Sequence, residues 1–294
     1  MGRVLIADDE SDNNLSHHLL SQKDFTFICQ FVYQNTGIVL HEGKRAMVYR
    51  RLSRIVRERK FDSFTQYCQL LKNASEKEQA YFINAITTNL TGFFREKHHF
   101  DYLLNHEIPH ILAQNKKYYR SKKFRIWSSA TSTGEEAYSI AITLLKAMKA
   151  AISTWDVKIL ATDIDSNVIE IAKQGKYSQE CIEKIPVTDQ KTYFHRQQNN
   201  KGKFTFQTSE KLKELITFKQ LNLLHQWPIK GPFDIIFCRN VIIYFDKATQ
   251  QHLFERYYEL LKPGGLLILG HSESLGAYQT YFESVGRTIF RKPY

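Results

Sequence analysis

The sequence has no run of about 18 consecutive apolar residues, the minimum for a membrane-spanning helix, although 43% of its residues are hydrophobic. Its N-terminus also lacks the basic start and apolar core of a signal peptide. The sequence therefore predicts a cytoplasmic protein that does not insert into a membrane. Its 294 residues are enough for one large domain or two ordinary ones with a hydrophobic core.

Cysteine is scarce, and the four cysteines are scattered along the chain without a CxxC pair. They are Cys29, Cys68, Cys181 and Cys238. The histidines show no metal-ligand spacing, and we expect His17, His18, His98 and His99 to be solvated polar side chains. The sequence thus predicts reduced thiols and no metal site.

Neither of two common phosphate-binding loops, GxGxxG and GxxxxGK[ST], occurs in the sequence. A different ligand-binding turn is indicated by RIWSSATSTGEEAYSIAI (125–142), where a predicted strand passes through small residues into a predicted helix beginning with Glu135 and Glu136. Two carboxylates at a helix start repel a pyrophosphate but suit a cationic or hydroxyl-bearing ligand. They also complement the helix dipole without any ligand, and the residues alone do not separate these interpretations.

A second acidic position lies in ATDID (161–165), at the end of the next predicted strand. Asp163 falls at the strand tip, where open α/β folds bind ligands and where a carboxylate can accept hydrogen bonds from both ribose hydroxyls. Together with the preceding turn, this position predicts a site for adenosine without phosphates.

Two kinds of periodicity divide the chain. Residues 24–86 have the pattern of successive helices, broken at Gly37, at 62–63 and at 73–75. From Lys123 onward, short apolar runs (FRIWSS, VKILATD, FDIIFCRN, GLLILGHS) alternate with amphipathic helices, which is typical of a parallel α/β sheet. The predicted organisation is a polar extension at 1–22, a helical domain at 23–90, a connecting segment at 91–122 and an α/β domain at 123–294.

The α/β alternation is interrupted at about residues 176–218. There, KTYFHRQQNNKGKFTFQ (191–207) consists of two alternating runs around residues 199–202, which predicts a β-hairpin.

The formal net charge of +11 favours an acidic partner, such as a nucleic acid, an anionic membrane or an acidic protein surface. Its densest block is GKRAMVYRRLSRIVRERK (43–60), a predicted helix. At about 100° per residue, three apolar side chains and three arginines fall on opposite faces: Val48, Leu52 and Ile55 against Arg50, Arg54 and Arg57. Such a face is either simply solvated or a docking surface.

Five ordered motifs closely resemble the CheR family of chemotaxis receptor glutamate methyltransferases. They are NLTGFFRE (89–96), WSSATSTGEEAYS (127–139), ATDID (161–165), FCRNVIIYFD (237–246) and LKPGGLLILGHSES (261–274). The resemblance covers nearly the whole chain after residue 22. It departs from the family at Ala137, where proline is usual, and at Ser129 and Thr131, where other small residues are common.

The resemblance implies an α/β fold: a Rossmann-like class I methyltransferase domain, dependent on S-adenosylmethionine (SAM), with a small antiparallel β-subdomain insert. An all-helical N-terminal domain that docks the receptor precedes it. The implied activity is methyl transfer from SAM to glutamate carboxylates on cytoplasmic helices of chemoreceptors, leaving S-adenosylhomocysteine. A free glutamate has a pKa of about 4.3, so the acceptor is already ionised at neutral pH. This explains why no nucleophile, base or metal constellation is evident.

The resemblance also assigns roles to single residues by motif. Those implied for the cofactor are Asn89, Thr91 and Arg95 at its methionine end, Glu135 at its amino-acid part or the nearby backbone, Asp163 at the ribose, Asn222 and Leu223 at the adenine, and Asn240 and Val241 at the pocket floor. Arg95 and the Tyr244 hydroxyl are suited to orient the acceptor carboxylate. Since the receptor helices of this family are expected to be acidic, the resemblance also favours docking of such a helix by the basic face with Arg50, Arg54 and Arg57.

Several of these positions have a packing alternative. Phe93 and Phe94, in the first motif, are expected to be core residues rather than ligand contacts. Asn222 could instead cap a loop, and Tyr244 could be a buried aromatic whose hydroxyl binds the backbone.

Two other functions remain as alternatives. A basic nucleic-acid methyltransferase would explain the charge, but the sequence has no (N/D)PP(Y/F) motif. A SAM-binding module without turnover would keep the pocket, but Arg95, Asn240 and Tyr244 argue against it. Family members that tether to a receptor C-terminal pentapeptide have a glycine-richer insert than this chain, which offers Gly202, so we expect no tethering, and we expect a monomer.

Overall fold

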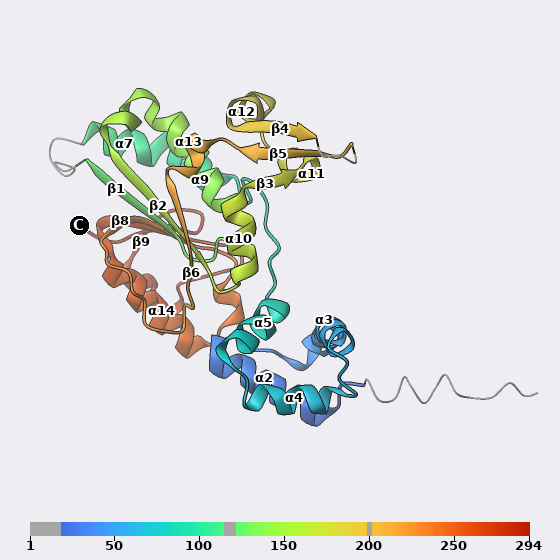
Figure 1. The fold of residues 1–294 in the computed structure, drawn as a ribbon. Helices are drawn as coiled ribbons and strands as arrows, with labels where there is room; N and C mark the ends of the chain where they lie inside the picture. The colour runs from blue at the N-terminus through green and yellow to red at the C-terminus, as the bar shows by residue number, and fades with distance from the viewer. Residues whose placement is uncertain (1–18, 115–121, 199–201) are drawn as a thin grey trace, which may run out of the picture. The chain divides into compact units, whose positions relative to one another are not determined.

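The structure is a computed structural model that describes residues 19–114, 122–198 and 202–294. Most of the predicted N-terminal extension, including His17 and His18, and residues 199–201 of the predicted hairpin turn lie outside the described residues. The chain divides into two compact units, Met1–Thr87 and Thr88–Tyr294 (Figure 1).

The first unit is helical. Its described elements are α2 (Gln22–Thr36), η1 (Glu42–Lys44), α3 (Arg45–Glu58), α4 (Phe64–Lys72) and α5 (Glu76–Ile86). Gly37 ends α2 with a φ of 72°, in the left-handed region that glycine tolerates. Ser63 and Ser75 cap α4 and α5, because each hydroxyl accepts a hydrogen bond from the backbone three residues later. The predicted helix breaks are confirmed.

Helix α3 has the two faces that its sequence predicts. Val48, Leu52 and Ile55 are buried in the core of the helical unit. The three arginines on the opposite face, Arg50, Arg54 and Arg57, are exposed.

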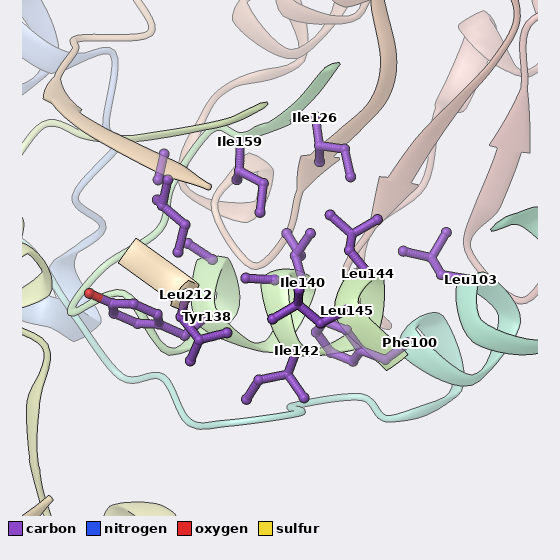
Figure 2. Close-up of a cluster of buried hydrophobic side chains, with 14 of the residues drawn as sticks. Phe100, Leu103, Ile126, Tyr138, Ile140, Ile142, Leu144, Leu145, Ile159 and Leu212 are labelled. Atoms are coloured by element: carbon purple, nitrogen blue, oxygen red, sulfur yellow. The ribbon is translucent and has the colours of Figure 1, made fainter. Parts of the chain in front are cut away.

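Helical elements start at His98 in the second unit. They are α6 (His98–Tyr102), the π-helical η2 (Leu103–Glu107) and α7 (Ile108–Ala113). The sequence predicted a connecting segment here, at 91–122. Instead, Phe100, Leu103 and Ile108 belong to the same buried cluster as helix α9 (Glu135–Met148), and Figure 2 shows Phe100 and Leu103 beside Leu144 and Leu145. The segment is thus part of the second unit's core.

Within the described residues, the main sheet of the second unit has seven strands in the order β6–β2–β1–β7–β8–β10–β9. They are β1 (Lys123–Ser128), β2 (Asp156–Asp163), β6 (Ile216–Gln220), β7 (Phe233–Cys238), β8 (Leu261–Leu269), β9 (Glu283–Gly286) and β10 (Ile289–Arg291). The strands from β6 to β8 are parallel, and β10 is antiparallel to both neighbours. The four strands predicted from sequence are confirmed, and β6, β9 and β10 are additional.

Helices cover both faces of this sheet (Figure 1). Ile126 of β1 and Ile159 of β2 point toward α9 in Figure 2. Trp127, the next residue of β1, points the other way and packs 5.4 Å from the ring of Tyr257. That tyrosine lies in α14 (Lys247–Leu260), which precedes β8 in the connection from β7. Because successive side chains of a strand point to opposite faces of the sheet, β1 contributes to the hydrophobic core on both faces.

The remaining helical elements of the second unit lie in the connections. They are η3 (Lys149–Thr154), α10 (Ser166–Gln174), α11 (Gln179–Ile182), α12 (Val187–Tyr193), α13 (Glu210–Lys213), η4 (Ile242–Tyr244) and η5 (Gly276–Tyr281). None of the helices within the described ranges has the length and apolar character to cross a membrane.

The insert forms a separate antiparallel sheet in the order β3–β5–β4. Its strands are β3 (Lys176–Ser178), β4 (Phe194–Gln198) and β5 (Phe204–Thr208). Pairing of β4 with β5 confirms the predicted hairpin. The insert was expected to extend to about residue 218, but β6 begins at Ile216 as an edge strand of the main sheet, because Ile216 and Phe218 are buried against the core.

Candidate functional site

The order of the main sheet defines where a ligand is expected. From β1 the chain continues to β2 and β6 on one side, and later to β7 and β8 on the other. Open α/β sheets bind ligands outside the carboxyl ends of the strands at such a reversal. The predicted turn at 129–134 leaves the carboxyl end of β1 at this point.

The last residue of this turn has to be glycine. Gly134 has a φ of 96°, and a Cβ there would lie 2.8 Å from Cβ of Ala172 and 3.0 Å from the hydroxyl of Tyr177. The turn is therefore packed closely against α10 and the start of β3.

Asp163 ends β2 and is 7% exposed. Its Oδ2 accepts a hydrogen bond from the backbone N–H of Ser132 at 2.8 Å, and its Oδ1 accepts one from Asp165 at 3.1 Å. Burial raises the pKa of Asp163 to about 6, although these backbone hydrogen bonds oppose the rise. A carboxylate has about four acceptor positions, so both oxygens can accept further hydrogen bonds from a ligand.

Asn89 is held beside the same turn. Its side-chain amide donates to Asp165 at 2.7 Å, and its carbonyl accepts from the hydroxyl of Ser132 at 2.9 Å. Asp165 also caps α10 by accepting from Asn167 at 2.9 Å. The first motif and the third are therefore joined at the carboxyl end of β2.

The paired glutamates, which the sequence did not distinguish, have different surroundings. Glu136 accepts from the Ser128 hydroxyl at 2.7 Å and forms a buried ion pair with Arg239 at 2.8 Å. Glu135 accepts from the Thr133 hydroxyl at 2.6 Å, and the described parts of the chain provide no ion pair for it. Burial raises the pKa of Glu135. Glu136 is thus a structural ion-pair partner, whereas Glu135 is suited to a cationic ligand.

Arg239 follows β7 and is 4% exposed. Besides pairing with Glu136, its guanidinium lies 3.4 Å from the carboxylate of Glu96 and donates to the carbonyl of Arg95. It thereby ties the first motif to the second and fourth.

Glu96 extends this network to the fifth motif. Its carboxylate lies 2.9 Å from Nδ1 of His271 and accepts from the His271 backbone at 3.1 Å and from the Asn240 amide at 3.2 Å. Burial acts to raise the pKa of Glu96, but the His271 hydrogen bond and the Arg239 charge outweigh it and hold the pKa at about 2. Glu96 is therefore anionic in this network at neutral pH.

Asn222 and Leu223 follow β6, whose end lies beside that of β2 because Leu221 donates to the carbonyl of Asp163 at 2.8 Å. Oδ1 of Asn222 accepts from the backbone of Leu224 at 2.9 Å, so this side chain does cap its loop. Leu223 is buried.

The remaining residues of the first motif are partly exposed or packed. Phe93 is buried and packs edge-on against Tyr177 at 4.9 Å, which confirms its packing role. Phe94 is half-buried against the same core. Thr91 and Arg95 are half-buried, and the Arg95 guanidinium donates to the carbonyl of Leu90 at 2.7 Å.

Asn240, Val241 and Tyr244 lie in the turn after β7. The backbone N–H groups of Asn240 and Val241 donate to the carboxylate of Glu273. Tyr244 ends η4 and is half-buried, which is less than the burial that its packing alternative predicted.

The solvated position predicted for His99 is wrong. This side chain is 0% exposed, its Nε2 lies 2.8 Å from the Thr288 hydroxyl, and burial lowers its pKa to about 3. Within the described ranges, ligand atoms of Glu96, His98 and His99 lie within 4.8 Å of one another. Because Arg239 already lies 3.4 Å from the Glu96 carboxylate, a second cation there would be repelled.

The charged residues that organise the site were missed from sequence, namely Glu96, Arg239 and Glu273. All three lie inside the motifs that carry the resemblance. The available signal was local: Arg239 directly follows a six-residue strand that is buried throughout, and charged side chains are rarely buried without a partner.

Residues 89–291 match the family described as CheR methyltransferase, SAM binding domain, and residues 23–87 match CheR methyltransferase, all-alpha domain. Chemotaxis protein methyltransferase 2 of Pseudomonas aeruginosa is 44% identical over 274 residues, which are 92% of this chain and 93% of that protein. The probable chemotaxis protein methyltransferase of Rhizobium etli is 41% identical over 262 residues, covering 88% and 96%. The chemotaxis protein methyltransferase of Salmonella typhimurium is 43% identical over 273 residues, covering 92% and 90%. The chain therefore belongs to the CheR family of SAM-dependent chemotaxis methyltransferases.

Proposed function

We propose that this enzyme methylates glutamate side chains on the cytoplasmic helices of chemoreceptors, and that the residues around the 129–134 turn bind its cofactor. The observation that carries the proposal is a pair of buried carboxylates beyond the carboxyl ends of adjacent strands, without a phosphate cradle. Glu135 begins α9 after the turn that leaves β1, and Asp163 ends β2. Relatives named for chemotaxis methylation support the choice of substrate.

The surroundings of both carboxylates fit SAM. Glu135 suits the ammonium of the methionine part, since the described residues place no cation on it. Asp163 keeps acceptor capacity for the ribose hydroxyls. Bound SAM supplies a methyl group that is bonded to a positively charged sulfur. The neutral thioether is the leaving group, so no further activation is needed.

The residues of the chain then have to position the acceptor and exclude water. We assign this to Arg95, whose guanidinium has five donors and uses one for the carbonyl of Leu90, and to the Tyr244 hydroxyl. The glutamate acceptor needs no general base because its pKa of about 4.3 leaves it ionised at neutral pH. Catalysis then rests on alignment of oxygen, methyl and sulfur.

The acceptor is tested by label transfer from methyl-labelled SAM. Receptor-containing membranes, the same membranes without receptors, and nucleic acid are offered separately. We expect label on the receptors in a form that base releases, as for a glutamyl methyl ester. Label on nucleic acid, or binding of SAM without any transfer, would contradict the proposal in favour of the two alternatives above.

Tyr244→Phe is expected to slow receptor methylation about 10- to 150-fold, because a hydrogen bond to a charged group contributes about 1.5–3 kcal/mol. Affinity for S-adenosylhomocysteine should stay unchanged, since the lost contact is to the substrate. Initial rates at saturating SAM and calorimetric titration measure the two effects. A wild-type rate would mean that the hydroxyl does not orient the acceptor.

Asp163→Asn is expected to weaken binding of S-adenosylhomocysteine by about 1–3 kcal/mol, about 5- to 150-fold, because one acceptor oxygen of the ribose site is replaced by a donor. Calorimetry at pH 7.5 measures the change. Asparagine has the same shape and can still accept from one of the two backbone N–H groups, so the fold should persist. Unchanged affinity would place the ribose elsewhere.

The same group predicts a pH dependence. Since the pKa of Asp163 is about 6, its protonation should weaken cofactor binding in the wild type as the pH falls below 6. This pKa lies above the unfolded value of about 3.9, so the protonation itself stabilises the fold, and the loss is not unfolding caused by this group. The variant Asp163→Asn should show a flatter pH profile between pH 5 and 7.5, and an identical profile would contradict the assignment.

A further inference from the structure

The carboxylate of Glu273 gathers an unusual number of backbone donors. Glu273 follows β8 and is 6% exposed. Its Oε2 accepts from Gly270 at 2.7 Å and Asn240 at 2.8 Å, and its Oε1 accepts from Val241 and Ile242 at 2.8 Å each. The carboxylate therefore accepts from three successive N–H groups of the turn after β7, at 240–242, and from one N–H group at the end of β8, that of Gly270.

This turn carries residues to which we assign the cofactor and the acceptor. Asn240 has a φ of 57°, in the left-handed region, so its N–H is turned out of line with β7. Its partner is the side chain of Glu273 instead of a strand. Tyr244 follows at the end of η4. Because hydrogen bonds to an ionised acceptor are short and strong, one carboxylate determines the path of the backbone from β7 to Tyr244.

Gly270 provides an independent sign that this contact is built closely. A Cβ at Gly270 would lie 2.6 Å from Nδ2 of Asn240, 2.8 Å from Oε2 of Glu273 and 2.9 Å from the backbone N of Asn240. The end of β8 thus approaches the turn as closely as the absence of a side chain permits. On its other side, the Asn240 amide donates to Glu96 at 3.2 Å.

We propose that Glu273 is a positioning residue for methyl transfer, which holds the 240–244 turn so that Asn240 and Val241 meet the cofactor and Tyr244 meets the acceptor. This inference rests on the function proposed above for those three residues. Glu273 itself is buried beneath the turn and acts through it. The competing explanation is that its carboxylate only stabilises the fold.

The test variant is Glu273→Gln, which preserves shape but has a single acceptor oxygen, so one pair of donors must face an NH₂ group. We expect amide hydrogen exchange of residues 240–244 to become at least about tenfold faster, and kcat at saturating SAM to fall at least about tenfold, as misplaced catalytic groups do. Gly270→Ala displaces the same turn from the other side and should produce the same pattern, which covers the case that the first variant does not fold.

The matched control is Asp234→Asn. Asp234 is also buried, accepts from the backbone of Arg125 at 2.7 Å and pairs with Lys262, but it lies at the amino end of β7, away from the turn. This control should lower the melting temperature without lowering kcat. A fall in kcat of the same size in the control, or a wild-type kcat in Glu273→Gln, would overturn the positioning role.

A double-mutant cycle separates this inference from the proposed function. If Glu273 acts through Tyr244, adding Tyr244→Phe to Glu273→Gln should cause little further loss. If the losses of the two single variants multiply in the double variant, Glu273 does not act through Tyr244. If Tyr244→Phe alone has wild-type activity while Glu273→Gln is slow, the proposed role of Tyr244 fails and the positioning role stands through Asn240 and Val241. If only Tyr244→Phe is slow, the positioning role fails and the proposed function stands.

Discussion

Arg239→Met is expected to lower the free energy of unfolding by about 3–5 kcal/mol, because it leaves a buried charge without its partner. Arg239 forms the 2.8 Å ion pair with Glu136, and both side chains are buried. Glu96 loses the same cation, although it keeps His271. Urea denaturation of the purified variant measures the loss.

Two controls test this explanation. Arg54→Ala removes an exposed ion pair with Glu58, at 2.6 Å, and should leave the free energy of unfolding nearly unchanged, because exposed ion pairs contribute little to stability. Adding Glu136→Gln to Arg239→Met should recover part of the loss, because the orphaned carboxylate is then neutral. A loss below about 1 kcal/mol in the single variant, or no recovery in the double variant, would mean that this ion pair does not determine the stability of the site.

Reversing Arg50, Arg54 and Arg57 to glutamate is expected to slow receptor methylation at low salt by about tenfold or more. We propose that the exposed basic face of α3 attracts an acidic receptor helix, and steering of this kind is screened beyond about 8 Å at physiological salt. The variant should therefore also lose most of the salt dependence of the rate. Its affinity for S-adenosylhomocysteine should not change, because the proposed cofactor residues all belong to the second unit.

The control for this variant carries the same change in net charge elsewhere on the helical unit. Lys23, Lys72 and Lys77 are exposed on three other helices of the same unit, α2, α4 and α5. Arg54→Glu also places a second negative charge four residues before Glu58, which is mildly destabilising in a helix. Melting temperatures are therefore compared first. Steady-state methylation across a salt series then decides: equal losses in both triple variants, or a wild-type salt slope in the arginine variant, would contradict docking by this face.

The sequence by itself determined the local elements of this protein. Helix limits at Gly37, Ser63 and Ser75 follow from backbone conformation and side-chain caps, which neighbouring residues decide. The four apolar strands, the small-residue turn before Glu135 and the position of Asp163 at a strand tip were predicted in the same way and are present in the structure. The ordered motifs identified the family, because each is a contiguous stretch of sequence that is recognisable without a structure.

The local sequence pattern did not predict the short strands of the main sheet. β6, β9 and β10 have only three to five residues each, and their exposed positions are polar. The predicted insert, at about 176–218, included the first residues of β6. Only pairing with β2 establishes its place in the main sheet.

Only the tertiary structure decided the partners of the charged residues. Glu135 and Glu136 are adjacent and chemically identical, and they differ because Arg239, 103 residues away from Glu136, pairs with one of them. Glu96 meets His271 across 175 residues, and Glu273 meets the turn after β7 across more than 30. Periodicity and capping act over a few residues, whereas the cost of burying a charge is met by whichever partner the fold brings within hydrogen-bond distance.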